Sequence, residues 1–120
     1  MLPNFLVLGC RGQVGWELMR TLQPLGRVTG VDYPDLDLTR PESVRPWLDQ
    51  TRPDVVINAA AYTAVDRAEA EPERARSLNA VAPALLAEET CRLGAWLVHY
   101  STDYVFDGTK PTAYAEDDPP

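Results

Sequence analysis

Residues 5–15 read FLVLGCRGQVG, and this stretch decides the fold class. The uninterrupted apolar run Phe5–Leu8 is typical of a short strand buried on both faces, as strands are in a parallel sheet. Apolar residues recur at helical spacing from Gln13 to Gln23, which predicts an amphipathic helix that Pro24 ends. Between the strand and the helix, glycines occupy every third position, at Gly9, Gly12 and Gly15. The stretch therefore predicts a strand, a glycine-rich turn and a helix in direct succession.

The rest of the chain repeats this alternation of strand and helix. Near-continuous apolar runs predict three more strands, at Val28–Asp32, Asp54–Asn58 and Ala95–Ser101. Helical patterns separate them, at Pro41–Gln50, Val65–Ala70 and Pro72–Arg92. Strands joined through helices form right-handed crossovers in an open parallel sheet with helices on both faces. We expect one α/β domain over residues 1–120, a Rossmann-like doubly wound parallel sheet that is incomplete after its fourth strand, with a loop from residue 102 onward.

Two prolines fall inside the predicted helices. Pro46 removes a hydrogen bond from an interior turn, so either the helix is kinked there or Ser43 caps a shorter helix whose first turn contains Pro46. Pro83 predicts a local bend in the long helix or a freed carbonyl near Asn79. Gly94 is expected to end that helix.

Composition narrows the classes of protein. The 120 residues suffice for one small domain, and 45% hydrophobic residues supply a core and exclude intrinsic disorder. The net charge of −7 argues against partners such as nucleic acid or an anionic membrane, and no apolar segment is long enough to act as an anchor. Cys10 and Cys91 lie far apart without metal-ligand spacing, so we expect reduced thiols, no metal site and a cytoplasmic location.

The glycine-rich turn and an acidic residue after the second strand predict a functional site. Such a turn lets the backbone approach the diphosphate of a dinucleotide at the positive end of a helix, although a tight turn without a ligand is the alternative. Asp32 ends the second strand, where a carboxylate accepts hydrogen bonds from ribose hydroxyls and favours NADH. Arg11 either pairs with the extra phosphate of NADPH or is a solvated charge. We expect NADH or NADPH as the cofactor.

Other candidates lie near the carboxyl ends of the strands, where open α/β sheets bind ligands. Asp37 either meets the adenine or forms an Asx turn. Asn58 precedes small residues that let a cofactor lie close over the sheet, or it ties down a loop. The hydroxyl of Thr102 follows the fourth strand at the same edge. His99, inside that strand, is expected to pack rather than to catalyse.

Four segments together resemble the dTDP-4-dehydrorhamnose reductases, a family of extended short-chain dehydrogenase/reductases: GCRGQVGWEL, RPDVVINAAAYTAVDRAEAEPE, LNAVAP and GAWLVHYSTDYVFDG. The similarity runs over essentially all 120 residues, and NAAAYTAVD and STDYVFDG are more particular than the glycine motif. The resemblance implies that dTDP-4-dehydrorhamnose is reduced to dTDP-L-rhamnose by hydride transfer from a nicotinamide cofactor. A nucleotide sugar is therefore the expected substrate.

The resemblance also implies roles for individual residues. Thr102 would donate a hydrogen bond to the substrate carbonyl, Asp103 beside it would face the substrate, and Asn79 would support the site. The expected cofactor-binding residues are Gly9, Arg11, Gly12, Gln13, Val14 and Gly15 in the turn, Asp32, Asp37 and Leu38 near the adenosine, and Ala59, Ala60, Ala61, Tyr62 and Thr63 after the third strand.

One departure from the family concerns the proton donor. In the family this is a Tyr paired with a Lys four residues later, and none of the five tyrosines here has that partner. We therefore expect residues 1–120 to supply cofactor binding and to be inactive alone. The alternatives are another extended nucleotide-sugar reductase, epimerase or dehydratase, a non-catalytic dinucleotide-binding subunit, and a small interaction module or poorly folded remnant.

The fourth strand is expected to be exposed. Its residues Trp96–Val98 are apolar, and no further strand pattern follows them to cover the edge. Such an edge promotes aggregation unless another chain covers it, and a homo-oligomer is one such arrangement.

Overall fold

The computed structural model describes residues 1–120, and strands alternate with helices along the chain. The strands are β1 (Asn4–Leu8), β2 (Arg27–Val31), β3 (Val55–Asn58) and β4 (Trp96–His99). The helices are α1 (Gln13–Thr21), α2 (Pro41–Thr51), α3 (Val65–Ala70), α4 (Pro72–Arg76) and α5 (Ala82–Leu93), with a π-helical turn (Ser77–Val81) before α5 and a 3-10 turn (Asp103–Val105) after β4. None of these helices has both the length and the hydrophobicity that a bilayer crossing demands.

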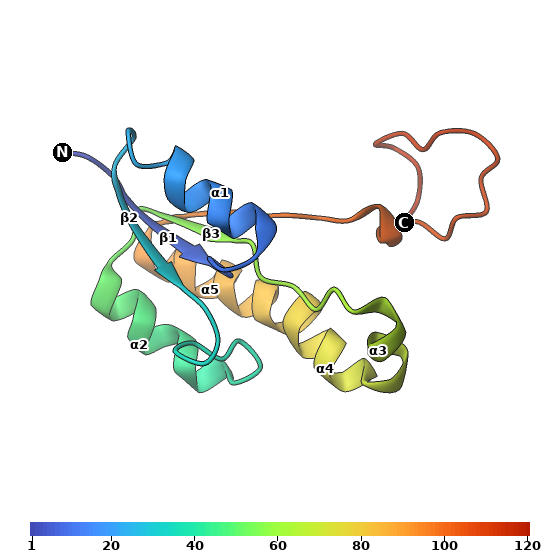
Figure 1. Ribbon diagram of the computed structural model, residues 1–120, viewed down its shortest axis with the longest axis horizontal. Helices are drawn as coiled ribbons and strands as arrows, with labels where there is room; N and C mark the ends of the chain where they lie inside the picture. The colour runs from blue at the N-terminus through green and yellow to red at the C-terminus, as the bar shows by residue number, and fades with distance from the viewer.

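The four strands form one parallel sheet in the order β2-β1-β3-β4 (Figure 1). β1 is central, because Leu6 pairs with Thr29 of β2 on one side and with Val56 of β3 on the other. The chain therefore moves outward from β1 to β2 and then returns past β1 to β3 and β4. This order confirms the predicted Rossmann-like doubly wound fold, and it places the change of direction beside β1, where such folds bind ligands.

Helices cover both faces of the sheet (Figure 1). α1 packs on β1 and β2 from one side, whereas α2 and α5 pack against each other on the opposite side. The main core lies on the α2 and α5 side. There Leu6 and Val56 of the sheet cluster with Leu48 of α2 and Leu86 of α5, and each of these side chains is at most 1% exposed. This packing holds the carboxyl ends of the strands at one fixed edge.

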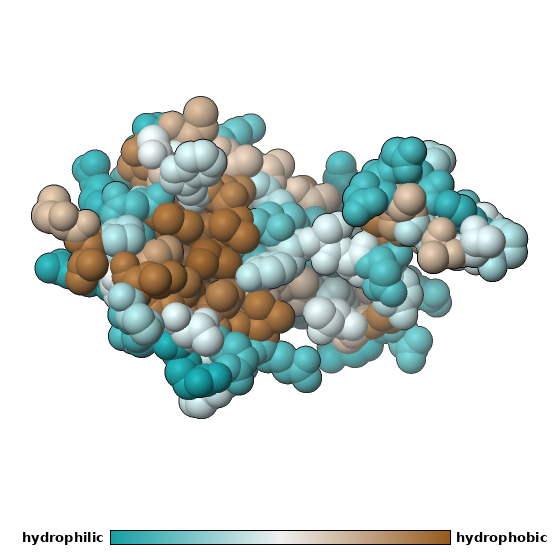
Figure 2. All heavy atoms as spheres, turned by 90° about the horizontal axis from the view of Figure 1, so that it is seen from above, coloured by the Kyte–Doolittle hydropathy of each residue, from teal (hydrophilic) through white to brown (hydrophobic).

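The α1 side of the sheet is only partly covered. Trp96 and Val98 of β4 pair in register with Val55 and Ile57 of β3, so all four side chains point to this side. Trp96 is 78% exposed and Val98 is 42% exposed. Figure 2, which looks down on this side, shows hydrophobic residues gathered in one broad patch. The expected exposure of the fourth strand is confirmed.

The bounds of α2 decide between the two alternatives for Pro46. α2 begins at Pro41 and contains Pro46 in its interior, so the shorter helix capped by Ser43 is wrong. Pro41 suits the first helical position, because its fixed φ is already helical and its missing N–H has no partner there. The Ser43 hydroxyl instead donates to the carbonyls of Asp37 and Arg40, both at 2.8 Å.

The bend predicted near Pro83 takes the form of the π-helical turn Ser77–Val81. Pro83 has no N–H to donate to the Asn79 carbonyl, and the widened turn lies immediately before it. The Ala82 N–H donates to the Ser77 carbonyl, five residues back. The helix then continues as α5 and ends, as predicted, at Gly94, whose φ of 70° is left-handed.

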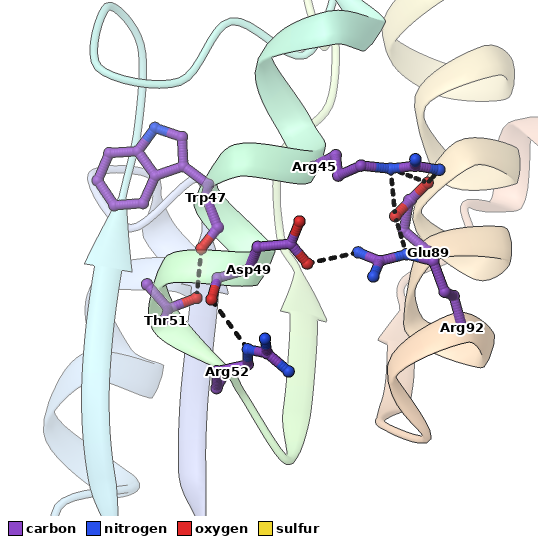
Figure 3. A network of polar contacts seen from close by, with 7 residues as sticks. All are labelled: Arg45, Trp47, Asp49, Thr51, Arg52, Glu89 and Arg92. Atoms are coloured by element: carbon purple, nitrogen blue, oxygen red, sulfur yellow. Dashed lines mark hydrogen bonds and ion pairs between the residues drawn. The ribbon is translucent and has the colours of Figure 1, made fainter.

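An ionic network joins α2 to α5 (Figure 3). The Glu89 side chain is 6% exposed, and it accepts hydrogen bonds from Arg45 at 2.6 Å and 3.0 Å and from Arg92 at 2.7 Å. Arg92 also donates to Asp49 of α2 at 2.7 Å. The hydrogen bonds from Arg45, and then those from Arg92, lower the pKa of Glu89. The buried carboxylate therefore stays ionised and ties the two helices together.

The residues after β4 leave the sheet. Figure 1 shows them running past the ends of the helices and closing into a loop. Within this loop the Phe106 and Tyr114 rings stack at 4.3 Å between centroids, and Lys110 pairs with Asp118. The predicted loop is confirmed, apart from the one 3-10 turn.

Candidate functional site

A cavity of about 780 Å³ opens at the carboxyl ends of β1, β2 and β3. This volume is typical of small-molecule sites, and the place is the edge at which open α/β sheets bind ligands. Most of the predicted cofactor-binding residues line it: Gly9, Arg11, Gly12, Gln13, Val14, Asp32, Asp37, Leu38, Ala59, Ala60, Ala61 and Thr63. The fold thus gathers three separate sequence segments around one space.

Glycines shape the turn between β1 and α1. Gly9 has a φ of 76°, and a Cβ there would lie 2.7 Å from the Ala60 nitrogen. A Cβ on Gly15 would lie 2.0 Å from the Gly9 carbonyl oxygen, so Gly15 lets α1 pack on the turn and does not itself line the cavity. Gly12 is the N-cap of α1, without a side-chain hydrogen bond and with no acidic residue in the first turn. The free N–H groups of that turn are therefore available to an anion.

Asp32 anchors the turn to the end of β2. Its carboxylate accepts hydrogen bonds from the backbone N–H groups of Arg11 and Tyr33, each at 2.9 Å. The Arg11 guanidinium donates to the Tyr33 carbonyl at 3.2 Å, so this cation and the Asp32 carboxylate share one rim of the cavity. Burial, and then the Asp32 charge, raise the pKa of the neighbouring Cys10 thiol. The rim therefore offers an acceptor and a cation side by side.

Asp37 forms the Asx turn that was one of its two alternatives. Its Oδ1 accepts hydrogen bonds from the Thr39 N–H at 3.0 Å and from the Thr39 hydroxyl at 2.6 Å. Those hydrogen bonds lower the pKa of Asp37, and the charges of Arg40 and Arg74 lower it further. Its Oδ2 accepts no hydrogen bond, so the ionised carboxylate still has an acceptor for a ligand in the cavity.

Asn58 ties the segment after β3 to the sheet. It is 1% exposed, and its Oδ1 accepts a hydrogen bond from the Ala60 N–H at 3.2 Å. Its Nδ2 lies 3.1 Å from Nδ1 of His99 on β4. The loop-tying alternative for Asn58 is therefore confirmed. His99 was expected to pack rather than to catalyse. It is exposed on an edge strand that nothing covers, so its ring contributes a hydrogen bond to Asn58 rather than core packing, and it does not line the cavity.

Tyr62 lies behind the cavity wall. Its backbone N–H donates to Asn79 Oδ1 at 2.8 Å, and its carbonyl accepts from Asn79 Nδ2 at 3.2 Å. Its hydroxyl donates to Glu71, which raises the pKa of Tyr62 and lowers that of Glu71. Of the predicted cofactor-binding residues, only Tyr62 and Gly15 do not line the cavity.

The predicted substrate residues lie elsewhere. Thr102 and Asp103 are not among the residues that line the cavity. Thr102 caps the 3-10 turn, where its Oγ1 accepts from the Tyr104 N–H at 3.2 Å and donates to Asp103 at 3.3 Å. The structure therefore does not bring these two residues to the cavity, and their role stays a prediction.

Sequence reasoning missed the far wall of the cavity. The lining residues that it did not name are Leu8, Val31, Tyr33, Leu36, Thr39, Arg74 and Leu78. Tyr33 directly follows Asp32, and Thr39 directly follows Leu38, so their place in the cavity could have been inferred from those two predicted residues. Arg74 and Leu78 belong to α4 and the π-helical turn, far along the chain. Leu78 begins the segment LNAVAP, but nothing in that segment points to the cavity, and Arg74 lies outside every motif. Only the packing of the helices brings them to the cavity.

The geometry fits a dinucleotide. Free N–H groups suit a diphosphate, the Asp32 rim suits a ribose, and three consecutive alanines leave space over the ends of the strands. No group of three or more His, Cys, Asp or Glu side chains gathers in a metal-binding arrangement.

Comparison with known proteins agrees with this geometry. The family model described as the RmlD substrate binding domain matches residues 3–120. The dTDP-4-dehydrorhamnose reductase of Burkholderia thailandensis is 53% identical over 116 residues, which are 97% of this chain and 39% of that protein. A protein of Streptomyces antibioticus named a probable dTDP-4,6-dihydroxy-2-methyloxan-3-one 4-ketoreductase is 49% identical in an alignment 120 positions long, which covers 97% of this chain and 40% of that protein.

A solved structure extends the comparison to the fold. The dTDP-4-dehydrorhamnose reductase of Bacillus anthracis, crystallised in complex with NADP, superposes with a TM-score of 0.93 at 36% identity. The superposition covers 100% of this chain and 43% of that chain. The chain thus spans about two fifths of the length of the relatives that it matches. Because the family model matches nearly every residue, this chain belongs to the RmlD family of dTDP-4-dehydrorhamnose reductases.

Proposed function

We propose that residues 1–120 form the cofactor-binding part of an NAD(P)H-dependent reductase that converts dTDP-4-dehydrorhamnose to dTDP-L-rhamnose. The observation that carries this proposal is the cavity in which the uncapped start of α1, Asp32 and the segment after β3 meet. The substrate follows from the name of the Burkholderia thailandensis relative, and the cofactor class is supported by the NADP bound to the Bacillus anthracis enzyme.

Each part of the cavity has a task in this proposal. The first turn of α1 holds the diphosphate, Asp32 receives the adenosine ribose, and Ala59–Ala61 leave room for the cofactor over the strand ends. When bound, the reduced nicotinamide supplies a hydride to the carbonyl carbon of the sugar. The Thr102 hydroxyl is proposed to polarise that carbonyl by donating a hydrogen bond.

The carbonyl oxygen also needs a proton. No tyrosine within residues 1–120 is followed by a lysine four positions later, and Thr102 is a weak acid. We therefore place the proton donor in polypeptide outside these residues.

A carboxylate placed at the start of α1 tests the proposal. Gly12 has a φ of −75°, and a Cβ there would meet only the Gly9 carbonyl oxygen, at 3.4 Å. Gly12→Asp should therefore fold, because Asp is a favoured N-cap. Its charge would occupy the anion position and repel a diphosphate, so we expect NADH and NADPH to bind at least about tenfold more weakly by calorimetric titration.

The matched control is Gly12→Ser, which adds a capping oxygen without a charge. It should leave binding within about threefold of the wild-type value while raising thermal stability as Gly12→Asp does. Equal binding by the wild-type protein and Gly12→Asp would show that no diphosphate sits at this helix terminus.

Two competing functions predict different outcomes in a turnover assay. The Streptomyces antibioticus relative is named for another keto sugar, so the protein at its natural full length should be assayed with several dTDP-4-keto sugars. A preference for dTDP-4-dehydrorhamnose supports the proposal. Cofactor binding without turnover of any of them would instead indicate a non-catalytic dinucleotide-binding subunit.

A further inference from the structure

One wall of the cavity comes from α4 and the π-helical turn, to which the sequence assigned no cofactor-binding residue. Figure 1 shows α3 and α4 extending beyond the carboxyl ends of the strands. From this extension Arg74 of α4 and Leu78 of the π-helical turn line the same cavity as Asp37 and Leu38, which follow β2. The cavity therefore has two facing contributions at this end, and each of them combines a charged side chain with a leucine.

Arg74 stands on a fixed support. Its guanidinium carbon lies 5.9 Å from the centroid of the Tyr62 ring. The Asn79 side chain holds both the N–H and the carbonyl of Tyr62, and Glu71 accepts the hydrogen bond of its hydroxyl. The ring under Arg74 is thus held by its backbone and by its hydroxyl.

Most arginines of the helical layer are paired: Arg45 and Arg92 pair with Glu89, and Arg67 pairs with Glu71. Neither arginine of α4 makes an ion pair or a side-chain hydrogen bond, although the chain carries a net charge of −7, and of these two only Arg74 lines the cavity. Its planar cation is therefore free to contact a ligand in the cavity.

The chemistry of this end of the cavity selects a flat aromatic ring that carries an amino group. A guanidinium plane stacks on purine bases, leucines pack on their edges, and a carboxylate oxygen accepts a hydrogen bond from an exocyclic amine. Asp37 Oδ2 is such an oxygen, because only Oδ1 is used within its own turn.

We propose that Arg74 is a specificity-determining residue that stacks on the adenine of the cofactor, with Leu78 beside it, across the cavity from Asp37 and Leu38. This inference rests on the proposed function, because it needs a dinucleotide in the cavity. It adds a contact from α4 to a site otherwise built from the strand ends and the glycine-rich turn.

The test is Arg74→Ala in the protein at its natural full length, with binding measured for ADP-ribose, NADH, NADPH and reduced nicotinamide mononucleotide. We expect roughly fivefold weaker binding of the three adenine-containing ligands and unchanged binding of the mononucleotide, which has no adenine. Arg76→Ala is the matched control, since Arg76 lies on the same helix, is exposed and does not line the cavity. Arg74→Lys keeps the charge without the plane and should resemble Arg74→Ala.

The outcomes separate the two proposals. A wild-type protein that binds none of the dinucleotides contradicts the proposed function itself. Wild-type binding that Arg74→Ala leaves unchanged overturns only the role of Arg74. Two results with the control variants also overturn that role: an effect of Arg76→Ala equal to that of Arg74→Ala, or full affinity in Arg74→Lys. Two results with Arg74→Ala itself do the same: weaker binding of NADPH alone, or binding of the mononucleotide weakened as much as that of ADP-ribose. The last result would mean that Arg74 only maintains the structure.

Discussion

At the scale of single residues, Asp32 and Arg11 are predicted to have opposite effects on the choice between NADH and NADPH. The Asp32 carboxylate accepts two backbone hydrogen bonds and remains at the rim, where a 2′-phosphate would meet its negative charge. Asp32→Asn keeps an oxygen acceptor for the turn and removes that charge. If the proposed reduction takes place, we expect the ratio of kcat/KM for NADPH to that for NADH to rise about tenfold, measured in the protein at its natural full length. Arg11→Ala should lower the same ratio, and an unchanged ratio in both variants would place the ribose elsewhere.

Residues of the site were predictable where a local rule ties them to a strand end. Gly9, Gly12 and Asp32 follow from the spacing of a strand, a turn and a helix, and all three line the cavity. Arg74 could not be predicted in this way, because its place depends on how α4 packs after two crossovers. For Thr102 the local rule did not hold. Its position directly after the fourth strand predicted a place at the edge of the cavity, but the chain leaves the sheet there, and Thr102 caps a separate 3-10 turn.

At the scale of elements, the contact between α2 and α5 depends on the ionised state of Glu89. The hydrogen bonds from Arg45, and then those from Arg92, lower its pKa below the ordinary value of 4.5. The stabilisation is therefore complete above that value and is lost as the pH falls through the lowered pKa of the folded state. Glu89→Gln should reduce the free energy of unfolding by roughly 1–2 kcal/mol at pH 7, because both arginines are partly solvated.

Urea denaturation from pH 7 down to about pH 3 checks this, because the difference between the wild-type protein and Glu89→Gln should shrink as Glu89 gains its proton. Glu88→Gln is the control, because Glu88 is the exposed neighbour of Glu89 and is not part of the network. It should not reproduce the pH-dependent loss of unfolding free energy expected for Glu89→Gln. A difference that stays constant with pH would mean that Glu89 acts by packing alone.

The elements themselves were largely predictable, since most strands are near-continuous apolar runs and the longer helices α1, α2 and α5 have an apolar stripe. The departures occur where proline allows two solutions. Pro46 is compatible with a helix that starts at Pro41 or at Ser43, and the tertiary contacts of the loop before α2 decide between them. Pro83 marked the place of a distortion but not its form, which is a π-helical turn whose Asn79 bonds the backbone of Tyr62.

At the scale of the whole molecule, the two faces of the sheet are unequally covered. The α2 and α5 side contains the main core, whereas β4 presents Trp96 and Val98 on the α1 side, along an unpaired strand edge. Figure 2 shows how broad this apolar surface is. Surfaces of this kind mark interfaces, and bare strand edges promote association.

We therefore expect isolated residues 1–120 to self-associate and to bind the dye ANS, as followed by sedimentation velocity and fluorescence. Trp96→Lys places a charge on the uncovered face and should shift the population towards monomer while reducing ANS fluorescence. Trp16→Lys is the matched control, because Trp16 is 67% exposed but belongs to α1 rather than to the sheet. The relatives are more than twice as long as this chain. A protein of their length should bind less ANS than residues 1–120 do if its further polypeptide covers the face. A monomeric, ANS-free fragment would show instead that the exposed strand edge and its apolar face are stable in water without a partner.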